Sequence, residues 1–458
     1  MNDRRSLSDA ETRTALAHAL GHEVHFPGDA AYLRATEIWN GAVEAQPVAV
    51  VVCGDQRDVS RAVRAARELG LPLSVRGGGH DWAGRSLRHG GLVIDLSAMR
   101  QVVIYPDALE AVVGGGATAG DLIAAARPHG LVAATGNVGA VGVAGLTLGG
   151  GYGPLMGRFG LAADNLISAE IVGQDGRIEV ADSVRNPDLL WALRGGGGNF
   201  GVVASMRIRL HPLEPLFAGI VLFSWDQAHA VLSQYASWVT QAPDELSLLA
   251  GIFPSPSGEP LVIIAPAWSG DVAAGEEALA MIRTWGTPIL WQVAPLPYAG
   301  LLSMYDAHIV NGRHYAMETR WMAGLDTQAL ASMVNAGAAR TSPTSLIAIH
   351  HFHGAAARVA PDATAFGMRS PHFLVEILAS WDSSTPSEAR RHRGWAHELS
   401  NALASTALPG GYANLLAPDA VEQTAHAYGS NAGRLRELKN RFDPLNVFSS
   451  AIALPGAR

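Results

Sequence analysis

The sequence predicts an α+β fold, and three observations carry this prediction. Strand-like and helical segments alternate with short connections from residue 48 to 75, the order of a sheet covered by helices. Glycine-rich stretches follow in unusual density up to residue 201. Between about residues 216 and 405, apolar strand-like runs again alternate with helical patterns, which indicates a second α+β unit.

The length and charge of the chain limit its class. Its 458 residues exceed one ordinary domain, so two or three domains are expected. Apolar residues make up 48% and charged residues 16%, which is typical of a globular protein with a large core. The net charge of −8 argues against nucleic acid or an anionic membrane surface as the main partner.

The N-terminal region and the cysteine content indicate a cytoplasmic protein. The segment Met1–Glu23 is polar and helical and contains no apolar core of a signal peptide. No apolar run is long enough for a membrane helix. Cys53 is the only cysteine and falls in a strand-like run, so we expect a buried, inert thiol and no intramolecular disulfide or thiolate metal cluster.

The first unit begins with a strand–helix–strand pattern. Val48–Val52 is a β-branched strand, and Asp55 or Asp58 can cap the helix that follows, which ends at Gly70. Further strands are expected at Pro72–Val75, Leu92–Leu96, Leu109–Val113 and Val202–Leu210, a helix from Thr118 to Ala126 and a hairpin over Ala169–Val180. In the second region we expect strands at Leu261–Ile264, Leu346–Ile349 and Phe373–Ala379 and helices at Val272–Trp285 and Ser387–Leu403.

A glycine loop, Arg76-Gly77-Gly78-Gly79-His80, follows the second strand directly. Three successive glycines allow the backbone N–H groups to converge on one point, and such a nest binds phosphate or pyrophosphate. The alternative is a tight turn. A second dense region, Gly136–Gly153, indicates backbone that lies close against a large flat ligand, because a side chain would block the approach.

Five segments in chain order carry a resemblance to a known family: RGGGHDWAGRS, VGVAGLTLGGGYG, GLAADN, LLWALRGGGGNFGVV and RLRELKNRFDPLNVF. They resemble the berberine-bridge-enzyme-like flavoproteins, which have the vanillyl-alcohol-oxidase type of FAD-binding fold. The resemblance implies an N-terminal helical segment (1–45), a two-part FAD-binding domain (46–214), a substrate domain with a large antiparallel sheet (215–405) and a C-terminal segment that returns to the FAD domain (406–458). It spans nearly the whole chain and is weakest from about residue 216 to 346.

The resemblance also implies how FAD is held. His80 matches the histidine that bonds covalently to the flavin 8α-methyl group. Val138 stands where many members have a second attachment point, a cysteine, so a single bond is expected. The other residues expected to bind the cofactor are Arg76, Gly77, Gly78, Gly79, Ser86, Thr135, Gly136, Val141, Gly142, Gly145, Gly149, Gly150, Gly151, Val203, Asn414 and Asn446.

Val141 matches a position above the flavin C4a atom. A small side chain there goes with reaction with dioxygen in the family, whereas leucine goes with dehydrogenase behaviour. The alternative is that Val141 only packs.

Two residues are candidates for the base that takes a proton from the substrate. Glu376 alternates with Val375 and Ile377 in an apolar strand, where a carboxylate is costly to bury without a partner or a task. It also matches the family's base-bearing strand; the alternative is a salt-bridged or edge glutamate. Tyr412 matches the first tyrosine of the family's Tyr-x-Asn-Tyr motif, but Leu415 replaces the second one, and Tyr412 can equally be a core aromatic residue.

Three further polar groups are weaker candidates. His351 and His353 share one face of a strand, but two imidazoles without a carboxylate make a poor metal site, and no metal is expected. Arg320 can orient a substrate or form a surface ion pair.

The predicted function is that of a covalent FAD oxidase. It would remove a hydride from a small-molecule alcohol, sugar or amine and pass the electrons to dioxygen, giving hydrogen peroxide. The alternatives are an FAD-dependent dehydrogenase or oxidative cyclase of a natural-product pathway, and a non-catalytic flavin-binding protein. We expect a monomer or homodimer; the substrate and the choice between Glu376 and Tyr412 stay open.

Overall fold

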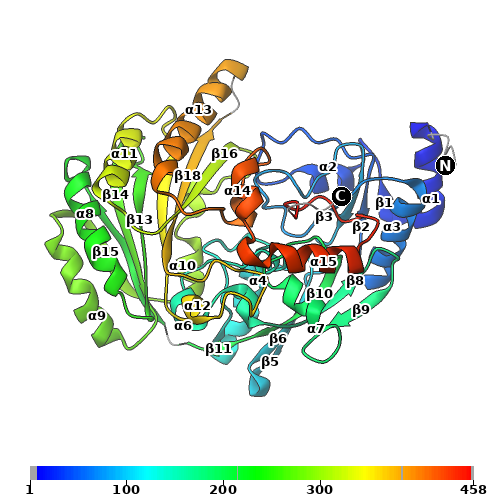
Figure 1. Cartoon of the computed structure of the whole chain (residues 1–458), viewed down its shortest axis with the longest axis horizontal. Coiled ribbons are helices and arrows are strands. Elements are labelled where there is room, and N and C mark those ends of the chain that lie inside the picture. Colours follow the sequence, from blue (N-terminus) through cyan, green and yellow to red (C-terminus); the bar gives the residue numbers. More distant parts are fainter. Residues whose placement is uncertain (1–7, 214, 383–384, 455–458) are drawn as a thin grey trace.

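The computed structural model describes residues 8–213, 215–382 and 385–454 and has two halves side by side (Figure 1). The first half of the chain, in blue and cyan, forms the right-hand part of the view, and a large green and yellow sheet forms the left-hand part. The C-terminal helix α15 (Ala432–Phe442), in red, lies against the right-hand part, where it contacts α7 (Pro187–Leu193). The chain therefore returns to its first half at the end.

Within the described residues, the strands form a four-stranded, a five-stranded and a seven-stranded sheet and a two-stranded ladder. The first sheet has the order β1 (Val24–His25), β2 (Ala49–Val52), β4 (Leu92–Asp95), β3 (Leu73–Arg76). The second has the order β5 (Val102–Tyr105), β6 (Glu110–Gly114), β10 (Val202–Arg209), β8 (Leu166–Val172), β9 (Ile178–Ala181). The third has the order β15 (Pro288–Leu296), β12 (Leu216–Phe223), β14 (Pro260–Trp268), β13 (Leu246–Pro254), β17 (Leu346–Phe352), β18 (His372–Trp381), β16 (His314–Met322). The ladder pairs β7 (Leu131–Val132) with β11 (His211–Pro212).

The first sheet confirms the predicted βαβ order. Strands β2, β4 and β3 run parallel, and α3 (Gln56–Leu69) connects β2 to β3. Asp55 is the N-cap of α3, and Asp58 completes a capping box, so both predicted carboxylates act at this end. Gly70 ends the helix in the left-handed conformation, at φ 68°.

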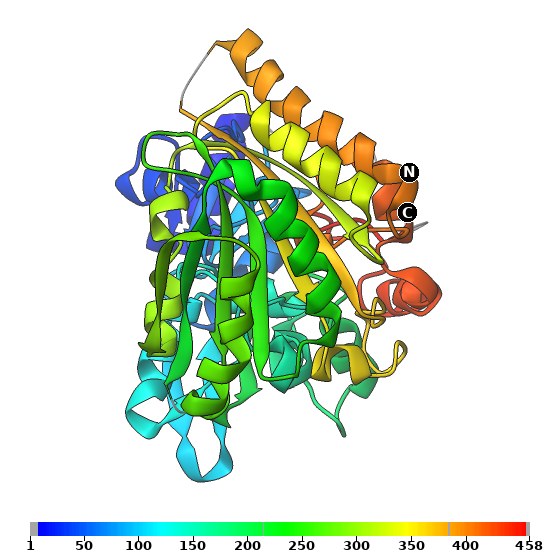
Figure 2. The same cartoon turned by 90° about the vertical axis from the view of Figure 1, so that its left-hand side faces the viewer.

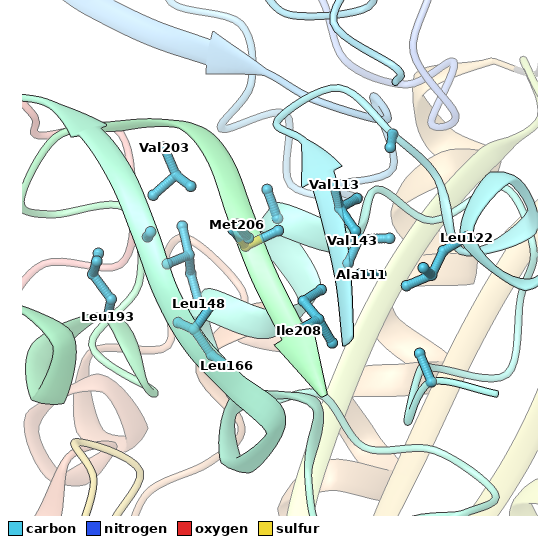
Figure 3. Close-up of a cluster of buried hydrophobic side chains, with 14 of the residues drawn as sticks. Ala111, Val113, Leu122, Val143, Leu148, Leu166, Leu193, Val203, Met206 and Ile208 are labelled. Carbon is cyan, nitrogen blue, oxygen red and sulfur yellow. The ribbon is translucent and has the colours of Figure 1, made fainter. Parts of the chain in front are cut away.

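The second sheet packs on helices that lead to the glycine-rich region. The antiparallel hairpin β8–β9 confirms the predicted hairpin. Figure 3 shows Met206 and Ile208 of β10 and Val113 of β6 in one buried cluster with Leu122 of α4 (Ala119–Ala126) and Val143 of α5 (Val143–Leu148). This core fixes the start of α5 against the sheet.

The third sheet is antiparallel and has two different faces. One face is covered by α8 (Ala228–Trp238), α9 (Val272–Ala280), α11 (Thr327–Ala338) and α13 (Pro386–Leu403), which lie in front of the sheet in Figure 2. The opposite face packs on residues of the first half, such as Trp82. The predicted helix to Trp285 is shorter, because α9 ends at Ala280 and a 3₁₀ turn continues to Thr284.

The remaining helices are short connections, apart from α1: α1 (Asp9–Leu20), α2 (Ala30–Thr36), α6 (Met156–Phe159), α10 (Tyr298–Ser303), α12 (Ala355–Arg358) and α14 (Val421–His426). The α+β class with a large antiparallel sheet is confirmed, whereas the domain boundaries after residues 45, 214 and 405 stay predictions. Among the residues that the structure describes, no helix is long and apolar enough to cross a membrane.

Candidate functional site

A cavity of about 320 Å³ lies at the glycine loops, within the size range of small-molecule and cofactor sites. Its walls come from the loop after β3, the start of α5, the start of β10, the segment Tyr412–Leu415 and the C-terminal Ser450–Ile452. The predicted site residues in these walls are Gly77, Gly78, Gly79, His80, Ser86, Val141, Gly142, Gly145, Val203, Tyr412 and Asn414. The structure therefore brings together predicted residues from four separate parts of the chain, 77–86, 141–145, 203 and 412–414.

The other predicted site residues lie outside the described lining of this cavity: Arg76, Thr135, Gly136, Val138, Gly149, Gly150, Gly151, Glu376 and Asn446. Arg76 is ion-paired with Asp95 at 3.1 Å, at the base of the glycine loop. The hydroxyl of Thr135 is hydrogen-bonded to Tyr298 at 3.1 Å. Asn446 lies in the turn after α15, where its N–H donates to the carbonyl of Asp443.

The first two glycine-rich loops meet each other directly. A Cβ placed on Gly78 would lie 2.5 Å from the backbone nitrogen of Gly142, and one placed on Gly142 would lie 2.6 Å from that of Gly78. Glycine is thus required at both positions because the two backbones touch. At Gly145, by contrast, no heavy atom of another described residue lies within 4 Å of a Cβ position, which leaves open space beside the cavity.

The run Gly149–Gly151 corrects the interpretation that its glycines face a flat ligand. A Cβ on Gly149 would overlap the side chain of Asn414, and one on Gly150 would lie 2.8 Å from the ring of Phe366. A Cβ on Gly151 would lie 2.5 Å from that of Ala162. Protein side chains from distant segments fill these spaces, so close packing explains these glycines.

His80 ends the glycine loop with an unsatisfied nitrogen. Among the described residues, its Nε2 has no hydrogen-bond partner although it is buried, and the ring stacks on Trp39 with centroids 4.5 Å apart. Burial lowers the pKa of His80 to about 4, against the charges of Asp81 and Glu376, which raise it. The imidazole is therefore neutral at physiological pH and can act as a nucleophile or hydrogen-bond acceptor.

Ser86 supplies a second orphaned polar atom at the cavity. Its Oγ is buried and has no hydrogen-bond partner in the described part of the chain. Buried polar groups are normally paired, and an unpaired one indicates a missing partner. Two such atoms beside the loop Gly77–Gly79, together with the open space at Gly145, fit a cofactor that carries phosphate and polar ring atoms.

Tyr412 is buried beside the cavity and strongly held. Its hydroxyl oxygen accepts hydrogen bonds from the N–H of Gly151 and from Nδ2 of Asn414, both at 3.0 Å. Burial raises the pKa of Tyr412 to about 12. The phenol therefore keeps its proton at neutral pH, which weakens Tyr412 as a base.

Glu376 lies on the sheet face turned toward the first half. Its neighbours in sequence, Val375 and Ile377, pack in the core beneath the helices, whereas Leu374 and Leu378 belong to clusters on the opposite face. The carboxylate Oε2 lies 3.3 Å from Nε2 of His350 on β17. The alternation of the strand thus places the Glu376 side chain on the face that adjoins the half of the molecule with the cavity. Its negative charge raises the pKa of His80.

The histidine pair and Arg320 take no part in this site. His351 and His353 stack with centroids 4.4 Å apart, and no group of three or more His, Cys, Asp or Glu in the described residues could hold a metal. Arg320 is buried against α13 and donates from Nε to Ser400, on the helix side of the sheet. The expectation of a substrate-orienting or surface-paired Arg320 was therefore wrong.

Sequence reasoning missed several residues of the walls. The run Gly195–Gly198 was visible as a motif, and Gly197 and Gly198 line the cavity. Ser450–Ile452 carries no motif, and its place follows only from the return of the chain. Trp39 gave no signal either, because its ring meets His80 only in the folded chain.

Comparisons with known proteins agree with this geometry. Residues 47–182 match the FAD binding domain family, and residues 411–455 match the family described as berberine and berberine like. An FAD-linked oxidoreductase of Bacillus subtilis (strain 168) is 30% identical over 95% of this chain and 98% of its own length. The (R)-6-hydroxynicotine oxidase of Paenarthrobacter nicotinovorans is 30% identical over 93% of this chain and 95% of its own length.

A solved structure shows the same fold. The crystal structure of 6-hydroxy-D-nicotine oxidase from Arthrobacter nicotinovorans superposes with a TM-score of 0.87 at 27% identity, covering 95% of this chain and 98% of the other. The resemblance to this family and the prediction of an enzyme are confirmed. The chain belongs to the berberine-bridge-enzyme-like family of FAD-linked oxidoreductases.

Proposed function

We propose that this enzyme is a covalent FAD oxidase. It would remove a hydride from a small-molecule alcohol, sugar or amine and use dioxygen as the electron acceptor, with hydrogen peroxide as product. The observation that carries the proposal is the neutral imidazole of His80, which lines the cavity at the end of the glycine loop with a buried nitrogen that has no partner among the described residues. A neutral imidazole is the form that can make a bond to carbon.

The residues that would hold FAD are those of the cavity walls. The backbone amides of the loop Gly77–Gly79 would bind phosphate, and Ser86 offers a hydroxyl that has no hydrogen-bond partner among the described residues. When bound, FAD supplies the acceptor for the hydride and the place where dioxygen is reduced. The single tether would be His80, because valine at Val138 has no nucleophile.

The proton of the substrate O–H or N–H would go to Glu376. Its carboxylate has His350 as a neighbour at 3.3 Å and lies on the sheet face that adjoins the cavity half. Tyr412, whose pKa is raised to about 12, is better suited to donate a hydrogen bond than to accept a proton. A carboxylate base of this kind suits amines and alcohols alike.

Val141 supports an oxidase over a dehydrogenase or cyclase. It lines the cavity next to Gly142, and its short side chain leaves more room there than a leucine would. The relative that oxidises (R)-6-hydroxynicotine, at 30% identity, makes a cyclic amine the first compound to try.

Two measurements test the proposal. After acid precipitation or denaturing electrophoresis, yellow fluorescence should stay with the wild-type chain, and His80→Ala should release it. In an oxygen electrode, a panel of cyclic amines (including 6-hydroxynicotine), secondary alcohols and oligosaccharides should give at least one compound that consumes oxygen and yields an equal amount of peroxide.

Each alternative has its own signature in these measurements. Flavin that leaves the wild-type chain on denaturation would exclude the covalent bond. Turnover with an artificial acceptor but without oxygen consumption would show a dehydrogenase, and flavin that no compound of the panel reduces would favour a flavin-binding protein.

A further inference from the structure

We propose that Trp39 is a positioning residue for the bond between His80 and FAD. The proposal rests on the proposed function, because it presumes that this bond forms. Trp39 comes from the N-terminal segment, which the sequence marked only as helical. It lies between the glycine loop and the large sheet, and its ring is buried, with 5% of its surface exposed.

The ring of Trp39 lies in a stack of three rings. On one side is the imidazole of His80, with centroids 4.5 Å apart and planes 12° from parallel. The ring of Trp39 also stacks on Tyr315 of β16, with centroids 4.1 Å apart and planes at 25°. Because Nε2 of His80 has no hydrogen-bond partner among the described residues, that nitrogen does not fix the plane of the ring. The plane is held by the flat contact with Trp39 and by the hydrogen bond between the ring and the backbone of His80 itself.

The backbone of Trp39 is tied to both sides of the site. Its N–H donates to the carbonyl of Gly79, the residue before His80, at 3.0 Å. Its carbonyl accepts from the N–H of Gly312, just before β16, at 3.0 Å. The stack therefore cannot shift without moving either the glycine loop or the edge of the sheet.

Asn40 locks the same segment from the next position. Its Nδ2 donates to the carbonyl oxygens of Trp82 and Tyr315, at 2.6 and 3.0 Å, and its Oδ1 accepts from the N–H of Tyr315 at 2.9 Å. Asn40 is itself buried, with 4% exposed, so these bonds are shielded from water. The hydrogen bonds of its own backbone and those of Asn40 thus fix Trp39 in place beside the imidazole of His80.

The chemistry of the tether explains why such a support matters. One bond forms between an imidazole nitrogen of His80 and the carbon of the flavin 8α-methyl group. One N–H and one C–H bond are lost, and dioxygen takes up the two protons and two electrons as hydrogen peroxide. A reacting group displaced by about 1 Å can lose roughly 10² in rate. A fixed imidazole plane therefore acts on the rate of tethering rather than on the binding of FAD.

The experiment measures tethering separately from binding. Wild type, Trp39→Leu and Trp39→Phe are each prepared in flavin-free form and incubated with added FAD. Bound FAD is read from the absorbance of the folded protein, and covalent FAD is read after denaturation. For Trp39→Leu we expect the rate constant of covalent incorporation to fall by about 10², with bound FAD near the wild-type level. Trp39→Phe keeps an aromatic face, so its rate constant of covalent incorporation should fall by less than about tenfold.

Trp395→Leu is the matched control. Trp395 is also 5% exposed and buried, but it lies in the core under the helices of the large sheet. It should lose stability and keep the wild-type rate of incorporation. A wild-type rate in Trp39→Leu, or an equal loss in Trp395→Leu, would overturn the positioning role.

Two remaining outcomes are also decisive. If Trp39→Leu does not fold, Tyr315→Leu removes the ring behind Trp39, and an unchanged rate of incorporation there would contradict the inference. If the wild-type chain itself releases its FAD on denaturation, the proposed tether fails and the inference falls with it. That result is distinct from a tethered wild type together with a Trp39→Leu that incorporates FAD at the wild-type rate, which would refute the inference alone.

Discussion

The carboxylate of Glu376 on β18 lies 3.3 Å from the imidazole Nε2 of His350 on the neighbouring strand β17. The two side chains are 20% and 14% exposed, on the sheet face opposite the helices. The contact gives Glu376 the partner that a carboxylate in an apolar strand needs. It suits both interpretations of this residue, a base held by a histidine and a structural pair, and kinetics can separate them.

Glu376→Gln should lower the rate of flavin reduction by about 10²–10⁴, the usual span for a positioned acid or base, because the amide cannot take the substrate proton. The measurement is anaerobic stopped-flow with the compound that the oxygen screen identifies. FAD binding should be unchanged, since Glu376 lies outside the described cavity walls. Tyr412→Phe is the comparison: a large loss there with Glu376→Gln near wild type would transfer the role to the tyrosine.

Val141→Leu should slow reoxidation of the reduced enzyme in air and leave flavin reduction nearly unchanged. The added methylene would fill space at a residue that lines the cavity beside Gly142. The two half-reactions are measured separately, reduction without oxygen and reoxidation after mixing with oxygenated buffer. Equal reoxidation rates in both proteins would refute the role of Val141 in oxygen access while leaving the family assignment intact.

The local parts of the fold could be predicted because their signals are local. Asp55 and Asp58 cap α3, and Gly70 ends it, all within a few residues of the helix they define. Alternation alone put Glu376 on the face of β18 opposite to Val375 and Ile377, because a strand has a period of two. The glycine-loop residues that line the cavity were expected from the family resemblance, not from a local signal.

The failures of prediction concern contacts between distant segments. Gly149–Gly151 seemed to face a ligand because their packing partners, such as Phe366 and Asn414, come from far along the chain. Arg320 seemed available to a substrate, since nothing near it in sequence shows that α13 covers that face. Trp39 is flanked by no motif at all, and only the folded chain brings it to His80.

Stability should fall as the pH drops from about 6.5 toward 4. Burial lowers the pKa of His372 to about 4 and that of His351 to about 3, so the folded state keeps both imidazoles neutral. An unfolded histidine takes up its proton near pH 6.5, so in this window the unfolded state binds more protons. The stabilisation that depends on these two neutral imidazoles is fully present above pH 6.5. It is lost as the pH falls through their pKa values in the folded state.

Melting temperatures of wild type and His372→Gln, measured from pH 7.5 to 4.5, check this expectation. His372 accepts a hydrogen bond from the hydroxyl of Tyr152 at 2.8 Å and donates from Nδ1 to the carbonyl of Ser370 at 2.7 Å. The variant should be less stable at pH 7.5 and show a shallower fall with acid. The exposed His129→Gln serves as the control. A slope in His372→Gln as steep as in wild type would contradict the assignment.

Lys439→Met should destabilise the fold by about 3–5 kcal/mol, because the buried carboxylate of Asp443 loses its ion-pair partner and keeps the N–H donors of Val447 and Phe448. Lys439, the only lysine of the sequence, is 3% exposed and donates to Asp443 at 2.6 Å and to the carbonyl oxygens of Asn199 and Phe448 at 2.8 Å. It thereby joins α15 to the loop after Gly198 and to the C-terminal segment, both next to the cavity. Denaturant unfolding of wild type and variant gives the difference in the free energy of unfolding.

An amine-reactive label offers an independent check in the wild type. Lys439 should react only when this region opens, and it should react more slowly with FAD bound. Rapid labelling of the folded protein would show that the ammonium group is not held as described.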